Sequence, residues 1–142
     1  MQVFPSRGPH DGVVTKRQTV SSGAQWEALV GYSRAVRVGQ WVSVAGTTAA
    51  ADGGGAVGGD DIAEQGREAL RRIELALEQV GARMEHVVRT RMFVTDISRW
   101  AELGRVHGEI FAAIRPATTM VEVTRLIDPA LLVEIEADAV IT

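Results

Sequence analysis

Polar and apolar residues alternate most regularly near the end of the chain, between residues 133 and 141. Apolar side chains occupy every second position there, at Val133, Ile135, Ala137, Ala139 and Ile141. Three carboxylates stand between them, at Glu134, Glu136 and Asp138. This period of two predicts a β-strand with one buried face and one polar face. A second extended segment opens at Pro116 and a turn at Asp128-Pro129 joins the two, so we expect the carboxylates to lie beside this preceding strand.

Apolar spacings of three and four residues predict two amphipathic helices. The first starts after Asp61, a predicted N-cap with Glu64 as its capping-box partner, and ends near Gly81. Its apolar stripe consists of Ile62, Ala69, Leu70, Ile73, Leu77 and Val80. Its other charged residues form a predicted solvated face, made of Arg67, Arg71, Glu74 and Glu78. The second helix is expected over 97–114, and its inner side consists of Trp100, Leu103, His107, Ile110 and Phe111.

The remaining extended stretches complete an α+β domain. A hairpin of 32–38 and 41–48 turns at Gly39-Gln40, 18–22 is a candidate short strand, and a further strand covers 86–95. This order predicts one mixed sheet with two helices packed on one face. The glycine-rich segment 53–59 fits either a phosphate cradle or a loop. The loop is favoured because the Gly-Lys-Ser/Thr ending of a P-loop is missing.

The face of the sheet away from the helices is expected to be polar. It would carry threonines, Met120, Glu122, Glu134, Glu136, Asp138, Arg89 and Arg91. Such a face either lies open to water or forms an oligomer interface, in which arginine and glutamate pair across chains and clefts form at the joins. The sequence leaves both interpretations open.

Composition narrows the chemistry. Of the 142 residues, we expect 1–16 to form an arm or tail and 17–142 to form one domain. The absence of cysteine excludes disulfides, thiolate nucleophiles and cysteine-bound zinc. Lys16 is the only lysine, which disfavours a Schiff-base mechanism, including one that uses pyridoxal phosphate. The histidines at 10, 86 and 107 show no metal-ligand spacing, so we expect neither a metal nor a cofactor.

Charge and hydropathy restrict the partners. The net charge of −3 argues against a nucleic-acid binder that relies on a general positive field. No apolar run approaches the roughly 20 residues of a membrane-spanning helix, and residues 1–14 lack the pattern of a secretory signal. We therefore expect a cytoplasmic protein that binds neither nucleic acid nor membrane.

Several segments, in the right order, resemble one known family. Residues 32–39 (Y-S-R-A-V-R-V-G) are similar to its N-terminal Tyr-Ser-x-Ala-Val-x-x-Gly hairpin, and 42–46 to its strand ending in Ser-Gly. Residues 88–96 (V-R-T-R-M-F-V-T-D) resemble its Val-x-x-x-x-Phe-Val-x-Asp strand. Pro116-Ala117 and 133–137 (V-E-I-E-A) match its C-terminal motif. The chain thus resembles the Rid (RidA/YjgF) family, once labelled endoribonuclease L-PSP, from about Arg17 to its end.

The resemblance implies a fold, an assembly and a chemistry. Rid proteins are chorismate-mutase-like α+β domains that form homotrimers, with a central barrel lined by the sheets and a small-molecule cleft between each pair of subunits. Active members hydrolyse enamines and imines, such as 2-aminoacrylate, to a 2-keto acid and ammonia without a cofactor. An arginine directly after the Pro-Ala pair grips the substrate carboxylate. A glutamate in the last strand, which matches Glu134, orients or activates water.

This chain departs from the family pattern where that arginine is expected. Thr118 follows Pro116-Ala117, and a hydroxyl supplies neither the charge nor the fork geometry of a guanidinium. Losing such a contact costs on the order of 1.5–3 kcal/mol, so we expect weak or absent activity on 2-iminopropanoate. Further departures at the implied cleft are Ala45, Met120, Gly104 and His107. A cleft refitted for another ligand is therefore expected.

The candidate site follows from these matches. Glu134 is the predicted catalytic residue, and Tyr32, Thr118 and a backbone amide near Met120 would hold the substrate. Arg91 either replaces the missing anchor or forms a salt bridge with Glu122 or Glu136. His107 either binds substrate or is a satisfied core or interface histidine.

Two functional hypotheses from different classes remain. The first is a homotrimeric hydrolytic deaminase of an enamine or imine, for example a catabolic intermediate such as an aminomuconate. The second is a non-catalytic trimer that binds a metabolite as a sensor or scavenger. A ribonuclease is disfavoured by the acidic chain and its scarcity of lysine and aromatic residues.

Overall fold

The computed structural model describes residues 16–142, so the predicted arm at 1–16 falls, apart from Lys16, outside the described residues. One sheet holds six strands in the order β1-β2-β3-β6-β4-β5. Their bounds are β1 Arg17–Val20, β2 Ala35–Val38, β3 Trp41–Thr47, β4 Val87–Val94, β5 Ala117–Glu122 and β6 Val133–Val140. The pair β4–β5 is parallel and the others are antiparallel, which confirms the predicted mixed sheet.

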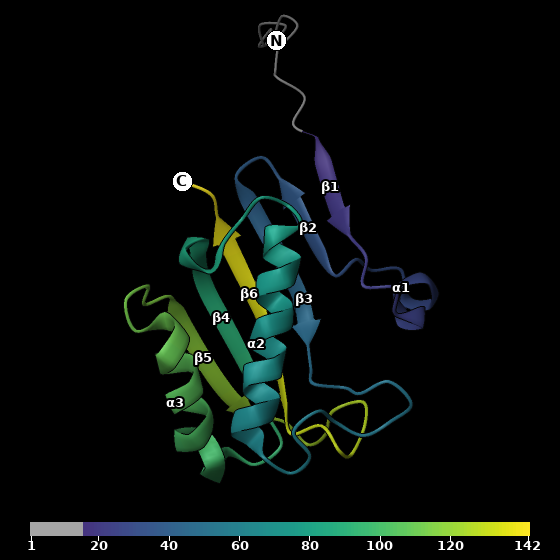
Figure 1. Ribbon diagram of the computed structural model, residues 1–142, viewed down its shortest axis with the longest axis vertical. Coiled ribbons are helices and arrows are strands. Elements are labelled where there is room, and N and C mark those ends of the chain that lie inside the picture. The colour runs from purple at the N-terminus through teal and green to yellow at the C-terminus, as the bar shows by residue number, and fades with distance from the viewer. Residues whose placement is uncertain (1–15) are drawn as a thin grey trace, which may run out of the picture.

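Two helices cover one face of the sheet, as predicted (Figure 1). They are α2 (Ile62–Glu78) and α3 (Trp100–Phe111), and each follows a strand that pairs within the sheet. Three shorter elements complete the described chain: α1 (Gln25–Val30) and the 3-10 turns η1 (Met84–His86) and η2 (Ile97–Arg99). Helix α1 was not predicted because six residues are too few to show a helical period.

The core lies between this helical layer and the sheet. The alternation at the end of the chain holds, because Val133, Ile135, Ala137 and Ala139 are all buried. They pack with Leu70, Ile73 and Leu77 of α2 and Leu103 of α3. Gly66 lets the two helices approach closely, since a Cβ there would collide with the Leu103 side chain. The stripe predicted for α2 is buried throughout, and Arg67, Arg71, Glu74 and Glu78 are exposed as expected.

The position of β6 corrects one prediction. The strands β5 and β6 do not pair; β4 lies between them, and β6 pairs with β3 on its other side. The crossover through α3 places β5 parallel to β4 at the sheet edge, and the segment after β5 then brings the chain back into the sheet. In this arrangement both edges of β6 have hydrogen-bonding partners.

The same topology corrects the face assigned to two residues. In the β4–β5 register Met92 faces Met120 and Val94 faces Glu122, so Met120 and Glu122 share the helix-covered side with these buried residues. They were predicted on the opposite face, because the prediction took β5 as the neighbour of β6. The carboxylate of Glu122 accepts a hydrogen bond from the backbone N–H of Ile97 (3.1 Å).

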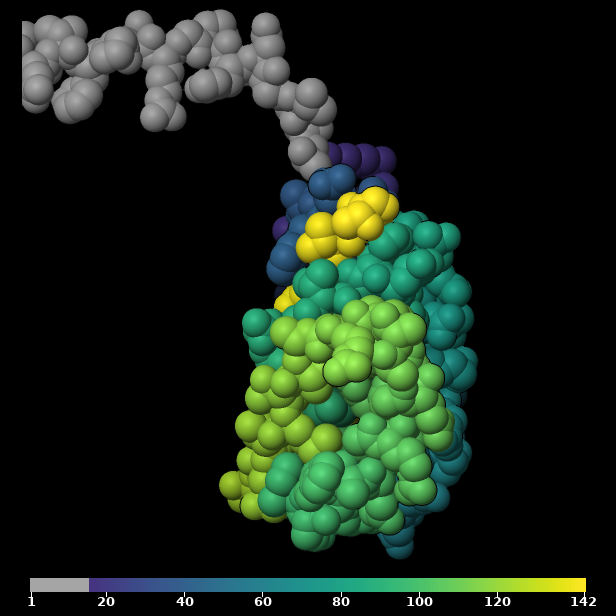
Figure 2. Space-filling view, turned by 90° about the vertical axis from the view of Figure 1, so that its left-hand side faces the viewer, coloured from purple at the N-terminus to yellow at the C-terminus, as the bar shows by residue number. Residues whose placement is uncertain are grey.

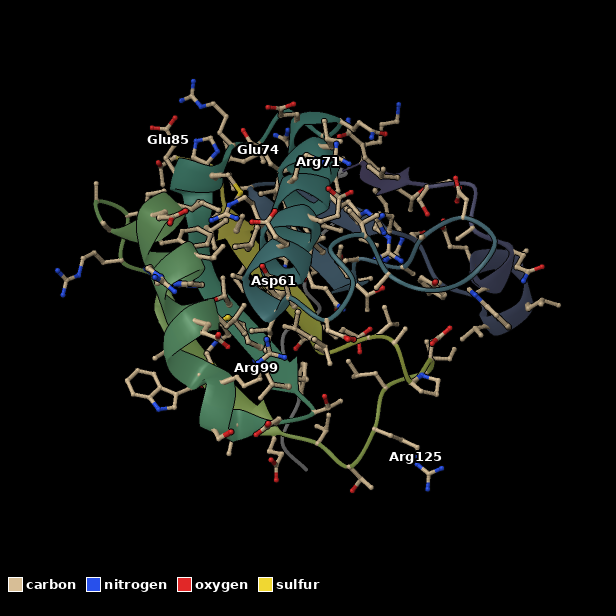
Figure 3. All side chains as sticks on the ribbon, turned by 60° about the horizontal axis from the view of Figure 1, so that its bottom comes forward. Asp61, Arg71, Glu74, Glu85, Arg99 and Arg125 are labelled. Carbon is tan, nitrogen blue, oxygen red and sulfur yellow. The ribbon has the colours of Figure 1, made fainter. Side chains whose placement is uncertain are left out.

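The start of α2 agrees with the prediction in its N-cap and differs from it in the capping box. The Asp61 carboxylate accepts from the amides of Ala63 and Glu64, which confirms the N-cap. The capping box is wrong, since Glu64 pairs with Arg67 instead. Figure 3 shows Asp61 near one end of α2 and Arg71 and Glu74 nearer the other. Because Asp61 occupies the first amides of α2, they are not free to bind a phosphate, and 53–59 forms turns, as the loop interpretation expects.

The second helix is shorter than predicted and begins with a different turn. The segment 97–114 starts as η2, capped by Asp96 through the amide of Ser98, and continues as α3 only to Phe111. The tighter first turn shifts the helical phase. Trp100 is therefore 61% exposed and lies along Gly104, so its predicted place on the inner side is wrong.

No helix within residues 16–142 is long and apolar enough to cross a membrane. Over the same range, no three His, Cys, Asp or Glu side chains gather where they could hold a metal ion.

Candidate functional site

The predicted site residues fall into two groups on opposite faces of the sheet. Glu134 and Tyr32 lie on the open face, away from α2 and α3, with Arg34 and Gly46; we call these four residues the Glu134 group. Thr118 and His107 lie on the helix-covered side, joined through Thr90; we call these three residues the Thr118 group.

A β-bulge shapes the Glu134 group. Between Val44 and Thr47 the strand β3 uses one residue more than its partner β6, so the register shifts. Gly46 lies in this bulge directly beneath Glu134. A Cβ on Gly46 would stand 2.7 Å from Glu134 Oε1 and 2.9 Å from its Cδ, closer than such atoms can approach. The glycine therefore makes room for the carboxyl group.

Arg34 connects the bulge to Tyr32. Its Nη1 donates to the carbonyl oxygen of Gly46 (2.6 Å) and to Thr47 Oγ1 (3.0 Å). Its Nη2 lies 3.4 Å from the Tyr32 hydroxyl, and its guanidinium carbon is 5.7 Å from the centre of the tyrosine ring. At that distance the cation attracts the ring face. Arg34 occupies a variable position of the family's hairpin motif, so the sequence did not predict it as a site residue.

Burial raises the pKa of the Glu134 carboxyl above its ordinary value of 4.5. The positive charge of Arg34 opposes this rise, and the negative charge of Glu136 adds to it. A carboxylate with a raised pKa is a stronger base than one in water, which suits it to accept a proton from a water molecule.

A concavity of about 450 Å³ lies on the open face beside this group. Its lining includes Tyr32, Ser33, Ser43, Arg91, Glu136 and Asp138. Arg91 Nη1 forms ion pairs with Glu136 (3.1 Å) and Asp138 (3.6 Å). Of the two interpretations of Arg91, the structure thus shows the salt bridge to Glu136. Its role as an anion anchor stays a prediction.

Three side chains meet in the Thr118 group. Thr90 Oγ1 lies 2.8 Å from His107 Nε2 and 2.9 Å from Thr118 Oγ1, and Thr118 Oγ1 lies 3.5 Å from His107 Nε2. Thr90 is fully buried, whereas Thr118 is exposed. Thr90 was not predicted, although a polar residue that shares its parity along the strand with the apolar Met92 and Val94 was a signal for it.

His107 is held by its neighbours as well as by this contact. Its ring centre is 4.5 Å from that of Phe111, and burial lowers the pKa of the imidazole below its ordinary value of 6.5. The neutral form is therefore favoured. Met120, which was predicted to bind substrate, is half-buried and packs against the hydrophobic core. Its part in ligand binding remains a prediction.

Figure 2 shows a hollow between the green surface of α3 and the yellow-green surface of β5, with teal atoms from an earlier part of the chain at its base. This is the side on which His107 of α3 and Thr118 of β5 meet. The sheet separates this hollow from the Glu134 group. Within one chain, the two groups therefore cannot contact the same small molecule.

Comparisons with known proteins give one consistent family. The model of the family described as Endoribonuclease L-PSP matches residues 22–141. A crystal structure of Rv2704 from Mycobacterium tuberculosis, described as a member of the YjgF/YER057c/UK114 family, is 62% identical with a TM-score of 0.81. That match covers 89% of this chain and 100% of the other.

Two curated relatives extend the comparison. The uncharacterized protein SCO2049 of Streptomyces coelicolor is 38% identical, over 84% of this chain and 89% of its own length. The 2-iminobutanoate/2-iminopropanoate deaminase of Salmonella typhimurium is 29% identical, over 87% of this chain and 97% of its own length. The alignment therefore spans nearly the whole described domain in each case.

Proposed function

This chain belongs to the Endoribonuclease L-PSP family, also called Rid or YjgF, and from that premise we propose that it is a cofactor-independent hydrolase of an enamine or imine. The observation that carries the proposal is the Glu134 group. It holds a half-buried carboxyl with a raised pKa above a glycine, close enough to the Arg34 guanidinium to feel its charge, and that guanidinium contacts the Tyr32 hydroxyl. The Salmonella deaminase supports the reaction class at 29% identity.

The proposed reaction needs one base that later acts as an acid. Ionised Glu134 accepts a proton from water as the oxygen attacks the carbon of the protonated imine, which gives a neutral carbinolamine. The same carboxyl gives that proton to the nitrogen. As a carboxylate again, it takes the hydroxyl proton while the carbon–nitrogen bond breaks, so ammonia and a carbonyl compound leave and the proton on Glu134 is released to water. A pKa raised toward neutrality favours these transfers, because general acid–base catalysis is most efficient near the working pH.

We propose that the reaction occurs between subunits of a homotrimer. The Glu134 group and the Thr118 group lie on opposite sides of one sheet, so both serve one substrate only if a neighbouring copy supplies one of them. The open face, with its concavity and exposed Trp41 and Val121, offers the surface for such contact. A chain found as a monomer by light scattering at micromolar concentration would exclude the shared cleft.

Ammonia release from a panel of imines tests the activity. The imines are generated in the assay from amino acids by an amino-acid oxidase, and their hydrolysis is followed with and without the protein. We expect acceleration with at least one imine, and loss of that acceleration in Glu134→Gln. No acceleration with any imine, or full activity in Glu134→Gln, would refute the assignment.

A second function, a trimer that binds a metabolite without turning it over, is favoured by Thr118. The residue that follows the Pro-Ala pair carries no charge, and Arg91 is paired with carboxylates of its own chain. Tight metabolite binding without ammonia release from any imine of the panel would support this function. We do not propose a ribonuclease, because a net charge of −3 opposes contact with phosphates.

A further inference from the structure

The Thr118 group is uncharged at every member. It consists of two hydroxyls and an imidazole whose neutral form is favoured, and a carbonyl oxygen closes it, since Thr118 Oγ1 lies 3.2 Å from the oxygen of Pro116. No lysine or arginine of the described residues forms a hydrogen bond with any of the three side chains. On the side where α3 and β5 meet, these three side chains therefore offer polar atoms that no cation of the described residues holds by a hydrogen bond.

Proton counting gives these hydrogen bonds a direction. The Thr90 hydroxyl has one hydrogen and two close partners, so it donates to one of them and accepts from the other. If His107 Nε2 carries a hydrogen, the order runs from His107 through Thr90 to Thr118, and Thr118 donates its own hydrogen to the carbonyl oxygen of Pro116, a bond of 3.2 Å that a ligand acceptor at the exposed hydroxyl could replace. In the other tautomer Thr118 donates to Thr90 and offers a ligand only lone pairs.

Thr90 and Thr118 differ in how far a ligand can reach them. Thr90 is fully buried and Thr118 is exposed, so a ligand reaches the Thr118 hydroxyl but not the Thr90 hydroxyl. A carboxylate placed there would lose hydrogen bonds to water and gain at most one hydroxyl donor and one imidazole in return. Most of its negative charge would stay unpaired, which costs free energy. A carbonyl or amide needs only the one or two hydrogen bonds that the group supplies.

We propose that the hollow between α3 and β5 binds an uncharged polar end of the ligand, such as an amide or a ketone carbonyl, with Thr118 as the residue that sets this specificity. Thr90 is a positioning residue, which holds the imidazole and the Thr118 hydroxyl in place. The proposal rests on the proposed function in one respect: it names the class of substrate for that same site. The reacting imine then belongs to an amide-bearing or ketone-bearing compound rather than to a simple 2-imino acid.

Two product-like probes of nearly equal shape separate these classes. Pyruvamide carries a neutral amide where pyruvate carries a carboxylate. We would titrate each into the full-length protein by NMR, with ¹⁵N-labelled histidine, and follow the ring signals of His107. We expect pyruvamide to bind at least about tenfold more tightly than pyruvate and to move the His107 signals, because one hydrogen bond contributes about that factor.

Variants of the group test the residues. Thr118→Val should weaken pyruvamide binding about tenfold and Thr118→Ser should restore it, since only the hydroxyl matters. Thr90→Val should weaken binding less and should change the His107 ring signals even without ligand. Thr118→Arg should reverse the preference and favour pyruvate. Thr119→Val, on the opposite face of the same strand, is the matched control and should bind as wild type.

The outcomes separate this inference from the proposed deaminase activity. Pyruvate binding as tightly as pyruvamide overturns the inference, and so does a wild-type protein that binds no pyruvamide at millimolar concentration. Arg115, which precedes the strand, is the cation to test if pyruvate wins; a loss of pyruvate binding in Arg115→Gln would identify it as the anchor. Pyruvamide binding without hydrolysis of any imine would leave the inference standing and remove the deaminase.

Discussion

The Glu134 group and the Thr118 group face away from each other across one sheet, and they differ in how their geometry is made. In the Glu134 group the backbone sets the geometry: a bulge, a bare glycine and a carbonyl oxygen position a charged carboxyl and a guanidinium. In the Thr118 group the side chains set most of it, through two hydroxyls and an imidazole, and the backbone adds one acceptor, the carbonyl oxygen of Pro116. The geometry of the Glu134 group depends on the fold of the backbone. Substitution of Thr90, His107 and Thr118 would remove the side chains of the Thr118 group.

This difference suggests a division of labour. A geometry that the backbone sets changes little when neighbouring side chains are substituted. Such a geometry suits a step common to many substrates, such as the activation of water. A group made mostly of side chains suits the part of the site that chooses among substrates. If this division holds, substitutions in the two groups should have separate effects on turnover and on ligand binding.

Glu134→Gln tests the charged side of the comparison. Removing the base should lower imine hydrolysis by about a hundredfold or more, because general base catalysis contributes that much. Binding of pyruvamide in the hollow between α3 and β5 should change far less. Steady-state ammonia release and NMR titration measure the two effects. Equal losses of turnover and pyruvamide binding would show that the groups do not divide the work.

Thr118→Arg tests the neutral side. A guanidinium after the Pro-Ala pair adds a charged contact to a carboxylate, so hydrolysis of 2-iminopropanoate should rise by about tenfold to a hundredfold. The comparison is made by ammonia release from imine generated from alanine. If the wild-type protein already hydrolyses this imine as fast as the variant, a threonine at this position does not limit activity on 2-imino acids.

Gly46→Ala disturbs Glu134 without changing its chemistry. The added methyl group would collide with the Glu134 carboxyl, whose flexible side chain has to move aside. We expect about a tenfold loss of turnover, since small displacements of catalytic groups carry large penalties, but little change in unfolding by urea. Gly108→Ala is the matched control, because a Cβ at Gly108 meets nothing within 4 Å. Similar turnover in the two variants would show that the position of Glu134 is unimportant.

The two groups should respond to pH in opposite directions. The folded-state pKa of Glu134 lies above its ordinary 4.5, so ionisation costs stability as pH rises from that value through the folded-state pKa. The pKa of His107 lies below its ordinary 6.5, so protonation costs stability as pH falls from that value through the folded-state pKa. We expect Glu134→Gln to raise the melting temperature at pH 7 but not at pH about 3.

The reciprocal variant completes this test. His107→Gln should flatten the loss of stability that His107 causes between pH 7 and pH 5, where the imidazole of the unfolded chain takes up a proton more readily than the half-buried imidazole of the folded protein. Calorimetry over this range is the measurement. An identical pH dependence of stability in His107→Gln and wild type would contradict the neutral state of His107.

Arg34→Gln carries the smallest expected effect. Glutamine keeps a polar side chain, but the positive charge that opposes the raised pKa of Glu134 is gone. The pKa of Glu134, followed by ¹³C NMR of its carboxyl carbon, should therefore rise further. Arg34→Lys keeps the charge and should leave the pKa close to that of wild type. A pKa that falls in Arg34→Gln would exclude this electrostatic role.

The spacing of apolar and polar residues along the sequence was enough to predict most of the fold. The alternation at 133–141 identified the buried and polar faces of β6, and the apolar spacing located α2 and most of α3. What failed depends on topology. Nothing in the spacing of β5 and β6 says that β4 comes between them, and that single fact moved Met120 and Glu122 to the other face.

The sequence predicted most residues of the candidate site but not their arrangement, again because the arrangement depends on topology. Glu134, Tyr32, Thr118 and His107 followed from the family resemblance, but their separation into two groups did not, because it requires the register of β5 on β4. Arg34 acts outside the regular strand, where parity gives no direction. Thr90 is polar at a buried position, and its partners come from elements 17 and 28 residues away.

The place of β5 at the edge of the sheet has an evolutionary consequence. Thr118 lies on a strand with one neighbour in the sheet, whereas Glu134 lies on a strand paired on both sides. Mutations at the margin of a sheet disturb few contacts, so they persist long enough for selection to sample new ligands. Mutations in the central strand are removed first for their effect on folding. A lineage with this architecture can therefore vary the residue at the position of Thr118 while it keeps the carboxyl of Glu134.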